Sequence, residues 1–173
     1  MDTSVWVAFT LYAKTDASAN AFASFDRTGY DFTGTGQTDR NLDILLGMVG
    51  HPWFTEATIA KEQGIIGQEI KMYDDDPQWR VMFNYLKAMY HSHPIREDIA
   101  GTVESIAKIT PELLYRCYNT FYNLGNMVLA IAGNFQVDKA LTVCDKMLKP
   151  AAPVTVQRMF PPEPDTIVQP VVE

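Results

Sequence analysis

Two glutamates seven residues apart, Glu62 and Glu69, are the side chains whose type and spacing best suit chemistry. Both fall in a stretch that we expect to be helical, and seven helical steps of about 100° bring the second carboxylate to within about 20° of the first. The same period places Ile59, Ile66 and Tyr73 on or near that face. Paired acids held against apolar packing suit a metal site or proton transfer. The alternative is that both are ordinary solvated helix charges, which are common.

The three histidines do not by themselves complete a zinc site, which normally needs three protein ligands. His91 and His93 are one residue apart in a loop that Pro94 ends, and this spacing chelates a metal only when the backbone is extended. His51 precedes a proline in a turn. We expect each ring to cap or to pack rather than to bind metal.

Other motifs point away from nucleophilic catalysis, phosphate binding and calcium. The sequence contains no G-x-S-x-G, no G-x-x-x-x-G-K and no G-x-G-x-x-G. The consecutive carboxylates Asp74–Asp76 lack the spacing of an EF-hand. We expect Asp76 to cap a helix and its two neighbours to be solvated.

Composition indicates one folded domain. A chain of 173 residues, 47% hydrophobic and 20% charged, can bury a core and is unlike a disordered chain. Fourteen basic against twenty-one acidic residues give a net charge of −7, which disfavours nucleic acid and anionic membranes as partners. No apolar run approaches the roughly 20 residues that cross a bilayer. Cys117 and Cys144 at apolar helix positions, with no recognisable signal peptide, favour the cytoplasm.

The hydrophobic periodicity predicts strands, then helices, then a β-α-β end. The expected strands are residues 4–12, 17–25, 28–35, 127–132 and 154–158, with a hairpin turn at Asp26-Arg27. The expected helices are residues 38–50, capped by Thr38-Asp39, then 55–73, 76–90, a short helix capped by Thr102, 110–122 and 137–148. This order indicates an α+β fold, with a mixed, mostly antiparallel sheet and helices packed on one face. We expect a domain over residues 1–149 and a proline-rich connector over 150–173.

Four colinear segments carry a more specific signal. They are ASANAFASFDRTGY (17–30), HPWFTEATIAKEQGIIGQEIKMYDDDPQWR (51–80), HPIREDIAGTVESIAKITPELLYRCYNTFY (93–122) and NMVLAIAGNF (126–135). Together they resemble the pitrilysin/insulinase family of zinc metallopeptidases, the inverzincins with an inverted H-x-x-E-H motif. Within that family the resemblance is to the bacterial processing-peptidase-like branch.

The resemblance implies a site and a substrate. Glu69 resembles the third zinc ligand of the family, and Glu62 resembles the acid that orients a ligating histidine. Asn20, Ala21 and Phe22 resemble the edge strand on which a substrate peptide adds as a further strand. In such an enzyme, zinc-bound water activated by the glutamate of H-x-x-E-H attacks a peptide carbonyl.

The H-x-x-E-H motif itself does not occur in this sequence, and residues 1–16 do not resemble the helix that follows it. In the family the zinc-binding histidines precede the ligating glutamate by more than the 68 residues that stand before Glu69. We therefore expect the chain to be a part of a larger two-domain zinc endopeptidase. This part should be inactive by itself and hold no zinc. Its partners would be peptides and the missing half of the protein.

Two other interpretations stay open. The chain could belong to a non-catalytic paralogue that pairs with an active peptidase subunit, although keeping Glu62 and Glu69 would then serve no metal. It could also be an α+β module that docks another domain, or a second copy, through exposed apolar helical faces.

Overall fold

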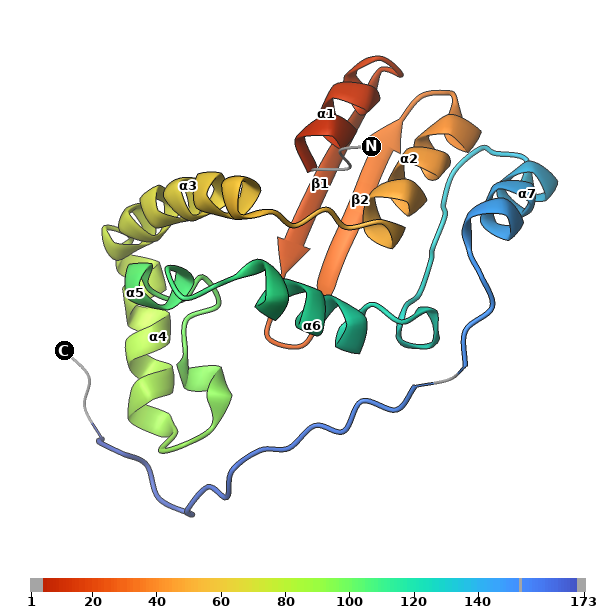
Figure 1. The fold of residues 1–173 in the computed structure, drawn as a ribbon. Coiled ribbons are helices and arrows are strands. Elements are labelled where there is room, and N and C mark those ends of the chain that lie inside the picture. The colour runs from red at the N-terminus through yellow and green to blue at the C-terminus, as the bar shows by residue number, and fades with distance from the viewer. Residues whose placement is uncertain (1–4, 153, 171–173) are drawn as a thin grey trace. The chain divides into compact units, whose positions relative to one another are not determined.

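A computed structural model describes residues 5–152 and 154–170, and its elements are those of an α+β chain (Figure 1). The predicted fold class is confirmed. The chain divides into two compact units, each described by itself below. The first comprises Met1–Thr55 and Glu112–Val156, and the second comprises Glu56–Pro111 and Gln157–Glu173. None of the described helices is long and apolar enough to span a membrane.

The first unit is built on a hairpin of β1 (Ala17–Ala23) and β2 (Thr28–Gly34). The two strands pair in antiparallel register along their whole lengths. The predicted turn at Asp26-Arg27 is confirmed, because the Ser24 N–H donates to the Arg27 carbonyl at 2.8 Å. β-branched and aromatic residues in β2, and turn residues between the strands, favour this hairpin.

Helices cover one face of the hairpin. Tyr12 of α1 (Val5–Ala13) stacks on Phe32 of β2, with ring centres 5.7 Å apart. Tyr30 lies two residues before Phe32 and so on the same face, and its hydroxyl is 2.6 Å from that of Tyr122, directly after α6 (Pro111–Phe121). Burial raises the pKa of the Tyr12 and Tyr30 hydroxyls. Both phenols are therefore neutral at physiological pH.

The predicted strand at residues 4–12 is wrong, since α1 occupies Val5–Ala13. Ala8 and Tyr12 are both buried, and their i, i+4 spacing is that of one helix face. The sequence of α1 is apolar on every side, so it offers no polar face against which a helical stripe could be recognised. β-branched and aromatic residues then imitate a strand.

Helices α2 (Thr38–Gly50) and α7 (Val137–Met147) confirm two predictions and enclose the hydrophobic core of the first unit. Leu42, Leu46 and Ala140 are buried there. The partly buried residues around them are Ile131, Phe135, Val143, Cys144, Met147 and Leu148. The predicted Thr38-Asp39 cap of α2 is wrong, because the helix begins after Gln37, which is left-handed at φ 51° and caps with no side-chain hydrogen bond.

The predicted strands at 127–132 and 154–158 are also wrong. In the part of the chain that the structure describes, the sheet consists of β1 and β2. Val128 is 94% exposed. An apolar extended run becomes a strand when a neighbouring strand takes its backbone hydrogen bonds, and the run's own sequence cannot supply that neighbour.

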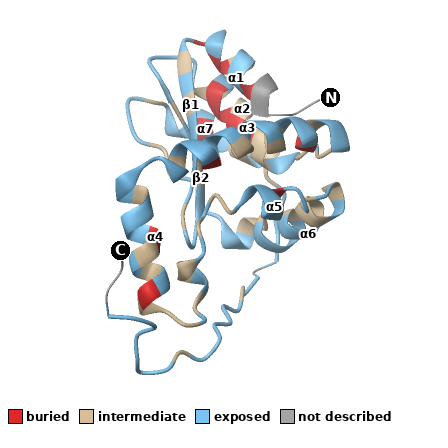
Figure 2. Cartoon of the chain, turned by 90° about the vertical axis from the view of Figure 1, so that its left-hand side faces the viewer, coloured by how far each residue is buried: buried red, intermediate tan, exposed pale blue. Residues whose placement is uncertain are grey.

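The second unit holds α3 (Glu56–Asp74), α4 (Pro77–Met89), the 3₁₀ turn η1 (Pro94–Arg96) and α5 (Val103–Ile106). Two predicted caps are confirmed. Asp76 accepts the N–H groups of Gln78 at 2.8 Å and Trp79 at 3.3 Å, and Thr102 accepts the Ser105 N–H at 3.2 Å. Figure 2 shows isolated buried positions on α4 and α5, and a long C-terminal segment that is mostly exposed.

A buried amide joins three parts of the first unit. Asn41 of α2 is fully buried, and its backbone carbonyl accepts the Tyr12 hydroxyl at 3.2 Å. Its side-chain oxygen lies 2.5 Å from the hydroxyl of buried Thr15, and its amide nitrogen donates to the Gly36 carbonyl at 3.1 Å. The single Thr15 proton is shared between Asn41 and the Tyr12 carbonyl, 2.9 Å away. These bonds hold the end of α1, helix α2 and the turn between β2 and α2 against one another.

Replacing this amide should destabilise the chain. In Asn41→Leu the Gly36 carbonyl loses its partner in a buried setting, so we expect the free energy of unfolding to fall by about 1–3 kcal/mol in urea titrations. The matched control is Asn119→Leu at an exposed position of α6, which should stay within about 0.5 kcal/mol. Equal losses in both variants would contradict the role given to Asn41.

Candidate functional site

Helix α3 carries both predicted glutamates, which confirms their shared helix. Glu62 is half-buried and Glu69 is exposed. The Tyr73 hydroxyl, one turn further along α3, donates to Glu69 Oε1 at 2.7 Å. This hydrogen bond is the main cause that raises the pKa of Tyr73. The Glu69 carboxylate is therefore held in one orientation with its remaining lone pairs open to solvent.

Aromatic stacking extends this arrangement into α4. The Tyr73 ring stacks on Trp79, with ring centres 4.5 Å apart and planes at 14°. The Trp79 indole N–H donates to Asp98 Oδ2 at 2.6 Å, and the indole ring also contacts buried Phe83 at 5.2 Å. A chain of contacts thus runs from Glu69 through Tyr73 and Trp79 to Asp98, and it makes the Tyr73 hydroxyl a fixed donor.

A pocket of about 340 Å³ lies beside this chain of contacts within the second unit. It is lined by Ile70, Tyr73, Asp74, Lys87, Asp98, Ala100, Gly101, Thr102, Val103 and Glu104. Three carboxylates against one ammonium give the lining acidic character. The pocket borders the side chain that orients Glu69.

The described residues do not fit a complete zinc site. No group of three or more His, Cys, Asp or Glu side chains within 5–152 and 154–170 is placed to hold a metal ion. Glu69 offers one carboxylate of the kind that zinc accepts, so the remaining ligands would have to come from outside these residues.

The histidines behave as the sequence predicts. His93 Nδ1 accepts the Ile95 N–H at 3.1 Å and so caps η1. His91 Nε2 lies 3.1 Å from the Thr166 carbonyl, and the His51 ring lies 3.3 Å from the Gly47 carbonyl. Asp74 and Asp75 are exposed, as expected. Each ring thus has a nitrogen within hydrogen-bond distance of a backbone group.

The predicted peptide-binding edge lies in the first unit. Asn20, Ala21 and Phe22 belong to β1 and are exposed, with β2 on one side and no strand of the described residues on the other. The Phe22 ring lies over Gly29 of β2, where an added Cβ would come within 2.3 Å of the ring. Open backbone groups along an edge strand are a template for another extended chain.

Comparison with known proteins decides the family. The family model for insulinase (peptidase family M16) matches residues 8–103, and the model for the peptidase M16 inactive domain matches residues 108–173. The chain belongs to the insulinase (M16) peptidase family. The predicted resemblance is thereby confirmed.

Similar proteins agree with this M16 assignment. The uncharacterized zinc protease YmfH of Bacillus subtilis (strain 168) is 57% identical over 125 residues, which cover 72% of this chain and 29% of YmfH. The mitochondrial-processing peptidase subunit beta of Caenorhabditis elegans is 30% identical over 132 residues, covering 75% of this chain and 29% of that protein. An M16-like peptidase from Alicyclobacillus acidocaldarius superposes with a TM-score of 0.87 at 42% identity, over 94% of this chain and 39% of that one.

The M16 chain therefore spans less than half the length of these relatives.

The sequence analysis did not predict the hydrogen bond between Trp79 and Asp98, which joins residues 19 apart and depends on the packing of α4. The hydrogen bond from Tyr73 to Glu69 had a local signal, since residues at i and i+4 of a helix are neighbours.

The contact between Phe22 and Gly29 can be tested by a double-mutant cycle. Gly29→Ala should displace the ring, so Gly29→Ala and Phe22→Ala should couple by about 0.5–1 kcal/mol in urea titrations. The matched control pairs Gly36→Ala with Phe22→Ala. These two changes should be additive, because a Cβ added at Gly36 meets nothing within 4 Å. Additive effects of the first pair would place the ring elsewhere.

Proposed function

We propose that this chain is part of a zinc-dependent endopeptidase and that Glu69 is one of its zinc ligands. Family membership and the printed names of zinc protease relatives support a zinc peptidase. The observation that carries the ligand assignment is the exposed Glu69 carboxylate on α3, which Tyr73 orients through one oxygen at 2.7 Å. A pre-oriented carboxylate loses less conformational freedom when it binds a metal.

Glu62 is proposed as a positioning residue rather than a ligand. It stands two helical turns before Glu69, on a nearby face of α3, and is half-buried. A carboxylate in such a place can accept the second ring N–H of a ligating histidine and so fix that ring. The histidine would be supplied by the remainder of the protein, along with the general base.

The open edge of β1 is proposed to bind the substrate as an added strand. Main-chain pairing along Asn20–Phe22 would hold an extended peptide with little dependence on sequence. Ala21 offers little steric hindrance at the centre of that edge, and exposed Phe22 offers apolar surface to a substrate side chain on the next position. Peptides with a propensity for extended structure would therefore be the preferred substrates.

A non-catalytic subunit is the second candidate. It is motivated by a relative whose printed name is that of a subunit, the mitochondrial-processing peptidase subunit beta of Caenorhabditis elegans. In that case the longer protein would bind peptides and hold no zinc. For either candidate function we propose a cytoplasmic location. The free thiols of Cys117 and Cys144 support it, because free cysteines are typical of reducing compartments.

Zinc affinity of the longer protein tests the roles of the glutamates. Titration against a chromophoric chelator should show a loss of tight zinc binding in Glu69→Gln, because a ligand is removed. Glu62→Gln should weaken zinc binding by about 10–100-fold, the effect typical of a residue that orients a ligand. Glu56→Gln, at an exposed position of the same helix, is the control and should bind as the wild type does. Unchanged affinity in Glu69→Gln would end the ligand proposal.

The Tyr73 hydroxyl should also affect zinc affinity. Tyr73→Phe keeps the stacking on Trp79 and removes the donor to Glu69, so we expect zinc to bind more weakly by about tenfold or less. Tyr85→Phe on α4 removes an exposed hydroxyl and should leave the affinity unchanged. Circular dichroism checks that both variants fold. Equal zinc affinity in the two variants would show that Tyr73 does not position Glu69.

A further inference from the structure

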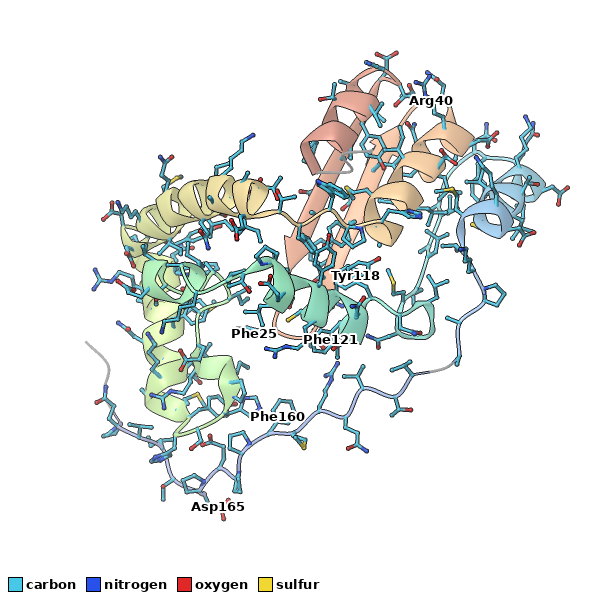
Figure 3. All side chains as sticks on the ribbon, in the orientation of Figure 1. Phe25, Arg40, Tyr118, Phe121, Phe160 and Asp165 are labelled. Atoms are coloured by element: carbon cyan, nitrogen blue, oxygen red, sulfur yellow. The ribbon has the colours of Figure 1, made fainter. Side chains whose placement is uncertain are left out.

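The C-terminal segment of the chain folds back as an extended strap on the second unit. Residues 160–169, which we call the strap, form no helix or strand, yet they belong to the same compact unit as α3 and α4. Figure 3 shows Phe160 and Asp165 along this extended segment. The strap contacts residues 88–93, which include the end of α4 and the start of the loop to η1.

A single carboxylate makes the central contact. Glu163 Oε2 accepts the His91 N–H at 2.8 Å, and Oε1 accepts the Ser92 N–H at 2.5 Å. The two oxygens of one carboxylate thus take two consecutive backbone donors. Hydrogen bonds to an ionised acceptor are roughly twice as strong as those between neutral groups.

The peptide group that follows His91 is held from both sides. Its carbonyl oxygen, that of His91, accepts Arg96 Nη1, and its N–H, that of Ser92, donates to Glu163. A cation and an anion therefore lie at the two ends of one peptide dipole. Hydrogen bonds linked in this way polarise one another, so removal of the anion weakens both.

Further contacts lie on both sides of Glu163. The Phe160 ring stacks on His93, with ring centres 4.6 Å apart. The Val168 and Gln169 N–H groups both donate to the Ala88 carbonyl, at 2.8 and 3.2 Å. Ala88 stands in the last turn of α4, where carbonyls have no acceptor role inside the helix. The strap therefore supplies two hydrogen-bond donors to a carbonyl at the C-terminal end of α4 that has no partner within the helix.

The sequence of the strap lowers the cost of ordering it. Pro162 and Pro164 flank Glu163, and each proline fixes its own φ and restricts the residue before it. An extended segment with prolines loses less backbone entropy on docking than a flexible one does. This composition fits a recognition segment better than a flexible linker.

We propose that residues 88–93 form a docking site for the proline-flanked acidic strap of this chain, and that the Glu163 carboxylate locks it in place. The strap is a detachable element: neutralising one carboxylate releases residues 160–169 while α3 and α4 stay folded. This proposal is independent of zinc and of peptidase activity.

Protonation of the Glu163 carboxylate should release the strap. Desolvation raises the pKa of Glu163, but the backbone N–H groups of His91, Ser92 and His93 and the charge of His91 lower it by more, so the net pKa lies below the ordinary value. Arg96 and His93 are the other basic groups on the loop that the strap contacts. Because the pKa of Glu163 is lower in the folded state than in the unfolded state, its ionised carboxylate stabilises the docked strap fully above the unfolded-state pKa. This stabilisation is lost as pH falls through the folded-state pKa.

Amide hydrogen exchange of His91 and Ser92, followed by NMR on the whole chain, tests the lock. In Glu163→Gln the amide NH₂ would replace one acceptor with a donor, so exchange at these two positions should accelerate by on the order of tenfold or more. Asp165→Asn is the matched control, since it removes the same charge from an exposed position of the same strap. It should leave both rates within about twofold.

Trypsin gives a second readout at Arg158–Met159, immediately before the strap. Cleavage there should be faster in Glu163→Gln than in Asp165→Asn, with cleavage within α3 and α4 unchanged. In the wild type, protection of Ser92, corrected for intrinsic exchange, should fall as pH drops below the ordinary carboxyl range, and Glu163→Gln should show no such fall. Equal exchange and cleavage in the two variants, or protection of Ser92 that is independent of pH, would overturn the proposal.

Discussion

The buried Asn41 amide is the constraint on which the first unit depends. A polar side chain with no solvent exposure must find partners inside the protein, and those of the Asn41 amide are Thr15, in the turn after α1, and Gly36, in the turn before α2. The backbone carbonyl of Asn41 also accepts the hydroxyl of Tyr12, at the end of α1. Satisfying this amide therefore fixes where the hairpin starts relative to both helices. The position of the β1 edge, with Asn20, Ala21 and Phe22, depends on those bonds, because β1 begins two residues after Thr15.

The second unit is organised by contacts of a different kind. α3 and α5 are joined by Gln63, whose side-chain nitrogen donates to the Ile106 carbonyl at 2.8 Å and the Ile109 carbonyl at 3.2 Å. α3 and α4 are joined by the stacking of Tyr73 on Trp79, which also holds the donor to Glu69. The orientation of the proposed zinc ligand thus follows from how two helices pack. Few side chains of this unit are fully buried, so these polar and aromatic contacts carry much of its organisation.

Local sequence signals predicted the parts of the fold that depend on local physics. The caps at Asp76 and Thr102, the hairpin turn and the amphipathic helices α2 and α7 all rest on residues within a few positions of one another. The failures concern tertiary context. α1 imitates a strand because every side of it is apolar, and residues 127–132 have the composition of a strand without a partner in the described chain. No local pattern reports whether a partner strand exists.

In the candidate site, too, the local features could be predicted from the sequence and the long-range contacts could not. The spacing of Glu62 and Glu69 on one helix was readable from the sequence, and the Tyr73 contact was within reach of the i, i+4 rule. The Trp79–Asp98 hydrogen bond and the docking of Glu163 on His91 and Ser92 join residues far apart in the chain. They arise from packing, which the sequence does not display.

The most direct test of the central claim is the zinc content of two purified proteins, measured by elemental mass spectrometry. One is this 173-residue chain, and the other is a longer protein of the length of its relatives that contains it. The account predicts one zinc per molecule of the longer protein and far less than one in the chain, because the proposed zinc site takes only one ligand, Glu69, from the described residues. No zinc in the longer protein, or equal zinc in both, would contradict it.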